Sequence, residues 1–60
     1  MKIKTLIVDD ERHARDFIES IVRSYCPQLE ICGIASNEQQ ALNIIDKEDP
    51  DLLLLDIEIC

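Results

Sequence analysis

The chain has 60 residues and a formal net charge of −7, from 13 acidic and 6 basic residues. A chain of this length holds one small domain and buries only about 60% of its unfolded surface. Phe17 and Tyr25 are its only aromatic residues, so the core must be built from Ile, Leu and Val. The scarcity of Lys and Arg excludes nucleic-acid binding by these residues, because phosphate contacts need clustered cations.

Cys26, Cys32 and Cys60 occur without a C-x-x-C pair. No apolar segment resembling a secretory signal follows Met1, and the longest strictly apolar run, residues 52–55, is far too short to span a membrane. We therefore expect a cytoplasmic protein with reduced thiols and no membrane contact. The first two cysteines are expected in or near the core.

Residues 3–8 are mostly β-branched or apolar without a clean period of two, which is typical of a strand covered on both faces. Asp9, Asp10 and Glu11 end this strand. A helix follows, with Asp10 as its expected N-cap. Its apolar stripe recurs at spacings of three and four and comprises Ala14, Phe17, Ile18, Ile21, Val22 and Tyr25. The helix ends at Cys26, because the residue before proline is biased away from helical geometry.

Residues 29–35 form the second expected strand, in which Gly33 indicates close packing against a helix. Ser36 and Gln39 have the spacing of a capping box, and they open a helix with one apolar face made by Ala41, Leu42 and Ile45. Residues 48–51 have turn chemistry. Residues 52–55 then predict a buried parallel strand that ends at Asp56.

The alternation of strands and helices predicts an α/β fold of order β-α-β-α-β, with a parallel sheet and right-handed crossovers. A third strand with no helix after it leaves one edge and one face of the sheet poorly covered.

Acidic residues follow two of the strands. Asp9 and Asp10 come after the first and Asp56 after the third. In open parallel sheets, ligands bind beyond the carboxyl ends of the strands where the strand order reverses. If the strand order is 2-1-3, these carboxylates face each other across one gap between neighbouring strands.

Converging carboxylates repel one another unless a cation lies between them, and hard oxygen ligands favour Mg²⁺ or Mn²⁺ over zinc. Such a site suits phosphoryl transfer to a carboxylate, since aspartate is a nucleophile of that type and the catalysis is largely positioning and charge neutralisation. A single aspartate after a strand is usually only a turn or cap residue. Asp9 and Asp10 together with Asp56 are less easily explained as turn or cap residues.

These residues resemble the receiver domains of two-component response regulators. Residues 6–11 are similar to the acidic-pocket motif of that family, and residues 49–59 resemble the segment that leads into its phosphoacceptor. Residues 36–37 and 41–42 resemble the start of the family's second helix. The resemblance covers all 60 residues but only about half of the family's domain. The run from Asp9 to Arg15, with Asp56 to Glu58, further resembles regulators with a LytTR-type DNA-binding domain.

The resemblance implies a flavodoxin-like (CheY-like) doubly wound sheet, of which the strands in order 2-1-3 are present. It implies that Asp56 is phosphorylated by the phosphohistidine of a sensor histidine kinase. Asp10 would ligate Mg²⁺ directly, Asp9 directly or through water, and Asp56 with the backbone carbonyl of Glu58 would complete the ligands. The output would be an absent, DNA-binding domain that regulates transcription.

Residues 1–60 are thus expected to be a partial receiver domain truncated after the third strand. The family's hydroxyl residue after the fourth strand, its lysine after the fifth, and its aromatic switch residue are not in the sequence. The family often has proline where this chain has Cys60. The resemblance implies that the 60 residues alone lack the groups that would counter the phosphoryl charge and help to trigger the switch.

Two alternatives remain open. The chain could be an inactive receiver that acts only in protein interaction or homodimerisation, through its third strand or first helix. It could instead resemble a haloacid-dehalogenase-like phosphatase, but that family needs a second aspartate where Glu58 stands.

His13 is expected to be a half-exposed helix residue, and Arg12 and Arg15 to lie on the solvated face or pair with nearby acids. No glycine-rich phosphate loop, catalytic triad or zinc spacing occurs.

Overall fold

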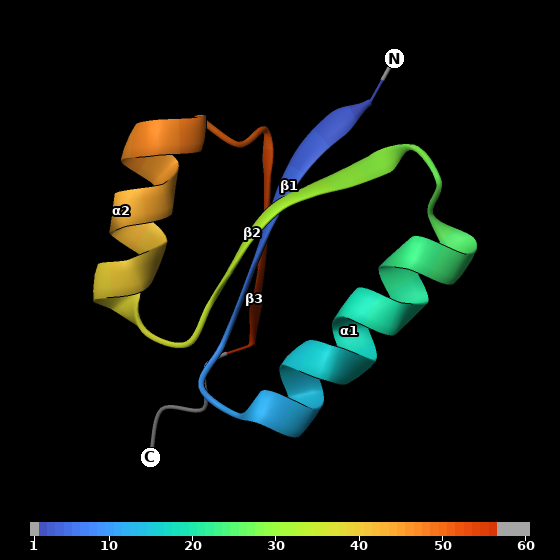
Figure 1. The fold of residues 1–60 in the computed structure, drawn as a ribbon, viewed down its shortest axis with the longest axis horizontal. Coiled ribbons are helices and arrows are strands. Elements are labelled where there is room, and N and C mark those ends of the chain that lie inside the picture. Colours follow the sequence, from blue (N-terminus) through green and yellow to red (C-terminus); the bar gives the residue numbers. More distant parts are fainter. Residues whose placement is uncertain (1, 57–60) are drawn as a thin grey trace.

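The structure is a computed structural model and describes residues 2–56. Its elements follow in the order β1 (Ile3–Asp9), α1 (Arg12–Tyr25), β2 (Leu29–Ala35), α2 (Glu38–Glu48) and β3 (Leu52–Asp56). Both outer strands pair in parallel with β1, which gives the strand order β2-β1-β3. Figure 1 shows α1 and α2 on either side of the strands. The predicted order of elements and the predicted arrangement of the sheet are confirmed.

The central strand β1 is buried on both faces. Every residue from Thr5 to Asp9 is at most 2% exposed. Leu6 and Val8 belong to a core cluster with Ala35 and Ala41, against which Cys32, Ile44 and Ile45 pack. Because both faces are covered, the strand shows no alternation of apolar and polar residues.

Helix α1 begins one residue later than its expected cap implies. Its N-cap is Glu11, which makes no side-chain capping hydrogen bond, and Asp10 is exposed. The prediction that Asp10 caps the helix was wrong. Asp9 makes the local bond instead, because its Oδ1 accepts a hydrogen bond from the backbone N–H of Glu11 at 2.9 Å. The acidic residue that closes this turn therefore belongs to the strand.

The apolar stripe of α1 is wider than its buried face. Val22 is buried and Ala14 and Ile18 are half-buried, whereas Phe17 is 67% and Tyr25 80% exposed. The row at residues 14, 18 and 22 turns toward the sheet, and the row at 17, 21 and 25 lies beside it. Among residues 2–56 the second row is left largely uncovered, so periodicity overestimated the buried face.

Gly33 on β2 lies against α2, as the sequence predicted. A Cβ atom at this position would come 2.9 Å from Cγ2 and 3.0 Å from Cδ1 of Ile44. The strand register shifts just before it, because Thr5 pairs with Ile31 and Leu6 with Gly33. Cys32 is therefore the extra residue of a β-bulge. Cys26 and Cys32 are half-buried free cysteines, in agreement with their predicted place near the core.

The N-cap of α2 is Asn37, so the predicted capping box is shifted by one residue. Its side chain accepts a hydrogen bond from Gln40 N at 2.9 Å. Oε1 of Gln40 accepts from the backbone N–H of Ser36 at 2.8 Å. The expected apolar face of α2 is also narrower than predicted, because Ala41 is buried while Leu42 is 51% exposed.

Strand β3 is an edge strand rather than a buried one. Leu53 is 40% and Leu55 62% exposed, so the predicted burial was wrong although the strand itself is confirmed. Among residues 2–56, β3 pairs with β1 alone. Between β3 and α2 lies an apolar hollow of about 240 Å³, lined by Val8, Glu38, Ala41, Leu42, Ile45, Leu53 and Leu55. None of the helices formed by residues 2–56 has the length and apolar character needed to cross a membrane.

Candidate functional site

Two of the predicted site residues end neighbouring strands. In the register of β1 with β3, Asp9 pairs with Asp56. Neighbouring strands of a sheet are about 4.8 Å apart. Figure 1 shows β1 and β3 ending at the same end of the sheet, beside the first turn of α1. The predicted adjacency of these two backbone positions is confirmed.

The carboxylate of Asp9 is buried and only half satisfied. The residue is 2% exposed. Its Oδ1 accepts the hydrogen bond from Glu11 N, whereas its Oδ2 is buried and has no hydrogen-bond partner among residues 2–56. Nearly all buried polar atoms have a partner, and leaving one without costs about 1–3 kcal/mol, more for a charged group. Asp9 therefore holds an oxygen atom that is suited to a cation or a proton donor.

The structure describes the other predicted metal ligands to different extents. Asp10 is exposed and follows Asp9 directly at the edge of the sheet. For Asp56 the structure gives the backbone position, while Glu58 lies outside the described residues. Within residues 2–56, no group of three or more His, Cys, Asp or Glu side chains could hold a metal ion. The described part of the predicted ligand set consists of the side chains of two consecutive residues, Asp9 buried and Asp10 exposed.

Arg15 contacts this turn in a way the sequence did not predict. Its Nη1 donates a hydrogen bond to the backbone carbonyl oxygen of Asp9 at 2.8 Å. It was expected on the solvated face or beside an acid, but it is half-buried and binds a carbonyl. Its place in the first turn of the helix after an acidic strand end was the available signal. Arg12 and His13 are exposed.

The described residues suit a hard divalent cation. Carboxylate oxygens are the preferred protein ligands of Mg²⁺, which commonly uses one or two carboxylates, several waters and a phosphate oxygen. Asp9 and Asp10 supply two carboxylates, one of them with the unpartnered Oδ2. A cation held here would lie next to the end of β3, where Asp56 pairs with Asp9.

The model of the "Response regulator receiver domain" family matches residues 5–60. No solved structure gives a significant match.

Curated relatives include proteins named protein-glutamate methylesterase/protein-glutamine glutaminase. The chain is 40% identical over 58 residues to one from Pyrococcus horikoshii, covering 97% of this chain and 16% of the relative. It is 41% identical over 59 residues to one from Thiobacillus denitrificans, covering 98% of this chain and 16% of the relative. A third, from Vibrio vulnificus, is 43% identical over 58 residues, which cover 97% of this chain and 16% of the relative.

The chain thus spans about one sixth of the length of these relatives. Their names give no support to the predicted LytTR-type subfamily or to transcription regulation. The match over residues 5–60, the strand order β2-β1-β3 and the acidic strand ends agree with one another. The chain belongs to the family of response-regulator receiver domains.

Proposed function

We propose that Asp56 is the phosphoacceptor of this receiver domain and that it takes a phosphoryl group from a phosphohistidine of a sensor histidine kinase, with Mg²⁺ bound by Asp9 and Asp10. The observation that carries the proposal is the pairing of Asp9 with Asp56 across neighbouring parallel strands. The unpartnered Oδ2 of Asp9 supports a cation at the same edge.

In the proposed reaction a carboxylate oxygen of Asp56 attacks the phosphorus atom. The phosphorus–nitrogen bond of the phosphohistidine breaks, and the imidazole leaves and takes up a proton. The product is an acyl phosphate. Bound Mg²⁺ supplies neutralisation of the phosphoryl oxygens. Asp9 and Asp10 hold the cation, together with Asp56 and the carbonyl of Glu58 as the remaining proposed ligands.

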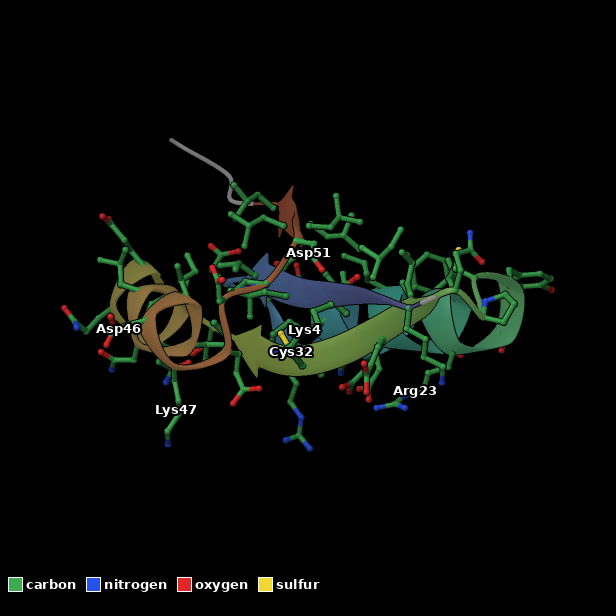
Figure 2. The ribbon with its side chains drawn as sticks, turned by 90° about the horizontal axis from the view of Figure 1, so that it is seen from above. Lys4, Arg23, Cys32, Asp46, Lys47 and Asp51 are labelled. Atoms are coloured by element: carbon green, nitrogen blue, oxygen red, sulfur yellow. The ribbon has the colours of Figure 1, made fainter. Side chains whose placement is uncertain are left out.

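The test is phosphorylation of the full-length protein by a small acyl phosphate in the presence of Mg²⁺. Asp56→Asn should abolish the uptake of phosphate, because an amide cannot serve as the nucleophile. Asp46→Asn is the matched control, since Asp46 is exposed on the side of α2 away from the sheet (Figure 2). Uptake that persists in Asp56→Asn at the rate of the control would overturn the proposal.

The output is a second part of the proposal. The methylesterase names of the relatives favour an enzymatic output over the DNA-binding output that the LytTR resemblance implied. Residues 1–60 would then be the N-terminal half of a receiver domain in a cytoplasmic signalling protein. The coding sequence downstream of codon 60 tests this. A methylesterase domain is expected there, and a LytTR-type domain would contradict the proposal.

A second candidate function rests on the exposed apolar side of β3. Leu53 and Leu55 are exposed on an edge strand beside the apolar hollow. Edge strands of this kind pair readily with other chains. The chain of residues 1–60 would then act as an interaction or dimerisation module. Light scattering discriminates, because a stably folded monomer would exclude the self-association version.

A further inference from the structure

Hydrogen bonds hold the turn between β1 and α1 at both of its ends, Asp9 and Glu11. Glu11 N donates to Oδ1 of Asp9 at 2.9 Å. Arg15 donates twice, through its backbone N–H to the carbonyl oxygen of Glu11 at 3.1 Å and through Nη1 to the carbonyl oxygen of Asp9 at 2.8 Å. Asp10 is the one residue between the two fastened positions, and it is exposed.

The bond from Arg15 supplies a partner that the helix does not. The Asp9 carbonyl lies at the end of a buried strand, where a backbone acceptor left without a partner is costly. Arg15 lies in the first turn of α1, six residues further along, and reaches back to it. Its planar guanidinium presents donors in a fixed geometry. The contact therefore links the first turn of the helix directly to the strand residue that carries the unpartnered oxygen.

We propose that Arg15 is a positioning residue that holds Asp9 and Asp10 in the geometry needed to bind Mg²⁺. The inference rests on the proposed function, and it adds a residue whose side chain bonds the backbone carbonyl of Asp9 and not its carboxylate. Groups that orient metal ligands in this way typically change metal affinity by about 10- to 100-fold when removed. For one bond to a backbone carbonyl, we expect the lower end of this range.

The direction in which Mg²⁺ affinity changes when Arg15 is removed distinguishes a positioning role from a purely electrostatic one. Arg15 is a cation beside an acidic cluster. If it acted only through its charge, its removal would make the cluster more negative, and Mg²⁺ would bind more tightly. If it positions the ligands, its removal weakens Mg²⁺ binding despite the more favourable charge. If it serves only the stability of the fold, the folded protein binds Mg²⁺ with unchanged affinity.

The experiment is an isothermal titration calorimetry measurement, in which Mg²⁺ is titrated into the full-length protein without phosphodonor. Arg15→Gln should raise the Kd for Mg²⁺ about tenfold. Arg15→Lys retains a cationic donor and should recover most of the affinity. Arg23→Gln is the matched control on the same helix, where Arg23 pairs with Glu19 at 2.8 Å and points away from the sheet (Figure 2). It should bind Mg²⁺ as the unmodified protein does.

The outcomes distinguish this proposal from the one on which it rests. Phosphorylation of Arg15→Gln by a small acyl phosphate should be slow at low Mg²⁺ and return to the normal rate when Mg²⁺ saturates. An unchanged or lower Kd in Arg15→Gln, with normal binding by the unmodified protein, would overturn the role of Arg15 and leave the proposed function standing. Absence of Mg²⁺ binding by the unmodified protein would overturn both. If Arg15→Gln does not fold, Arg15→Met takes its place, because it also removes the donor and the charge while keeping an unbranched side chain, and an unchanged or lower Kd there would contradict positioning.

Discussion

Strands β1 and β3 are parallel neighbours of similar sequence character, yet their surroundings differ. Both are apolar runs that end in an aspartate, and their terminal residues pair with each other. In β1 every residue from Thr5 to Asp9 is buried, whereas in β3 Leu53 and Leu55 are exposed. Within residues 2–56 the difference arises because β1 has a strand on each side and a helix on each face, while β3 has a strand on one side only.

The comparison separates two properties that an apolar run is often taken to predict together. The run predicts a strand, and both strands form. Burial depends on the position of the strand in the sheet, which the run itself does not encode. The proposed site joins these two environments, since Asp9 ends the buried strand and Asp56 ends the edge strand.

The same substitution in the two strands should have very different costs. In the chain of residues 1–60, Leu6→Ala removes a fully buried side chain from the core cluster and should lower the free energy of unfolding by about 3 kcal/mol. Leu55→Ala removes a side chain that is 62% exposed and should cost less than about 1 kcal/mol. Urea denaturation measures both. Equal costs would break the comparison and indicate that β3 is covered after all.

The contact between β2 and α2 tests how tightly the covered side of the sheet is packed. Gly33→Ala places a methyl group 2.9 Å from Cγ2 of Ile44 and should destabilise the protein by about 1–3 kcal/mol. Ile44→Leu removes the branched methyl while conserving volume. The double variant should therefore recover at least half of the loss, measured by the midpoint of thermal unfolding. Additive losses in the double variant would show that this contact is not the cause.

Asp9 should show a conflict between stability and function. Without Mg²⁺, Asp9→Asn replaces a buried charge by a neutral group that can still accept from Glu11 N, so stability should rise by about 1 kcal/mol. With Mg²⁺, the unmodified protein should gain stability through binding, while the variant gains none. Thermal unfolding with and without Mg²⁺ checks both. A Mg²⁺-dependent gain in Asp9→Asn equal to that of the unmodified protein would contradict the assignment of Asp9 as a ligand.

A substitution at the N-terminal end of β1, opposite the candidate site, should change stability and Mg²⁺ binding least. Lys4 Nζ donates to the carbonyl oxygen of Glu48 at 2.6 Å and lies 3.6 Å from Oε1 of the same residue. Figure 2 shows Lys4 beside Asp51, whose backbone N–H donates to the carbonyl oxygen of Lys4 at 2.8 Å. Because the Lys4 side chain is 40% exposed, Lys4→Met should cost less than about 1 kcal/mol and leave Mg²⁺ binding unchanged. A loss of Mg²⁺ affinity would show that the two ends of β1 are not independent.

Local patterns predicted the elements of the fold well. The strand at residues 29–35 has its predicted bounds, and β1 and β3 each extend one residue further, to Asp9 and Asp56. The close approach of Gly33 to a helix was also predictable, because glycine weakens a strand interior and is commonly found where another segment packs closely against the backbone. These features depend on short-range sequence or on general rules for parallel sheets.

Features that depend on tertiary surroundings were predicted less well. The row that includes Phe17 and Tyr25 has helical spacing but no covering element among the described residues, so its exposure could not be read from periodicity. The cap of α1 was misplaced because Asp9, not Asp10, bonds to Glu11 N.

Within the site, the adjacency of Asp9 and Asp56 was predictable from the strand order. The bond from Arg15 was missed, because its place in the first turn of the helix after an acidic strand end does not tell a backbone carbonyl acceptor from a nearby carboxylate.

The most direct test of the central claim is to locate the phosphoryl group on the unmodified protein. The full-length protein is phosphorylated by a small acyl phosphate with Mg²⁺ and then treated with borohydride, which reduces an aspartyl phosphate to homoserine. Peptide mass spectrometry identifies the converted residue. The proposed function predicts homoserine at position 56 and unchanged aspartates at positions 9 and 10. Conversion at Asp9 or Asp10, or a phosphoryl group on another residue with Asp56 intact, would contradict it.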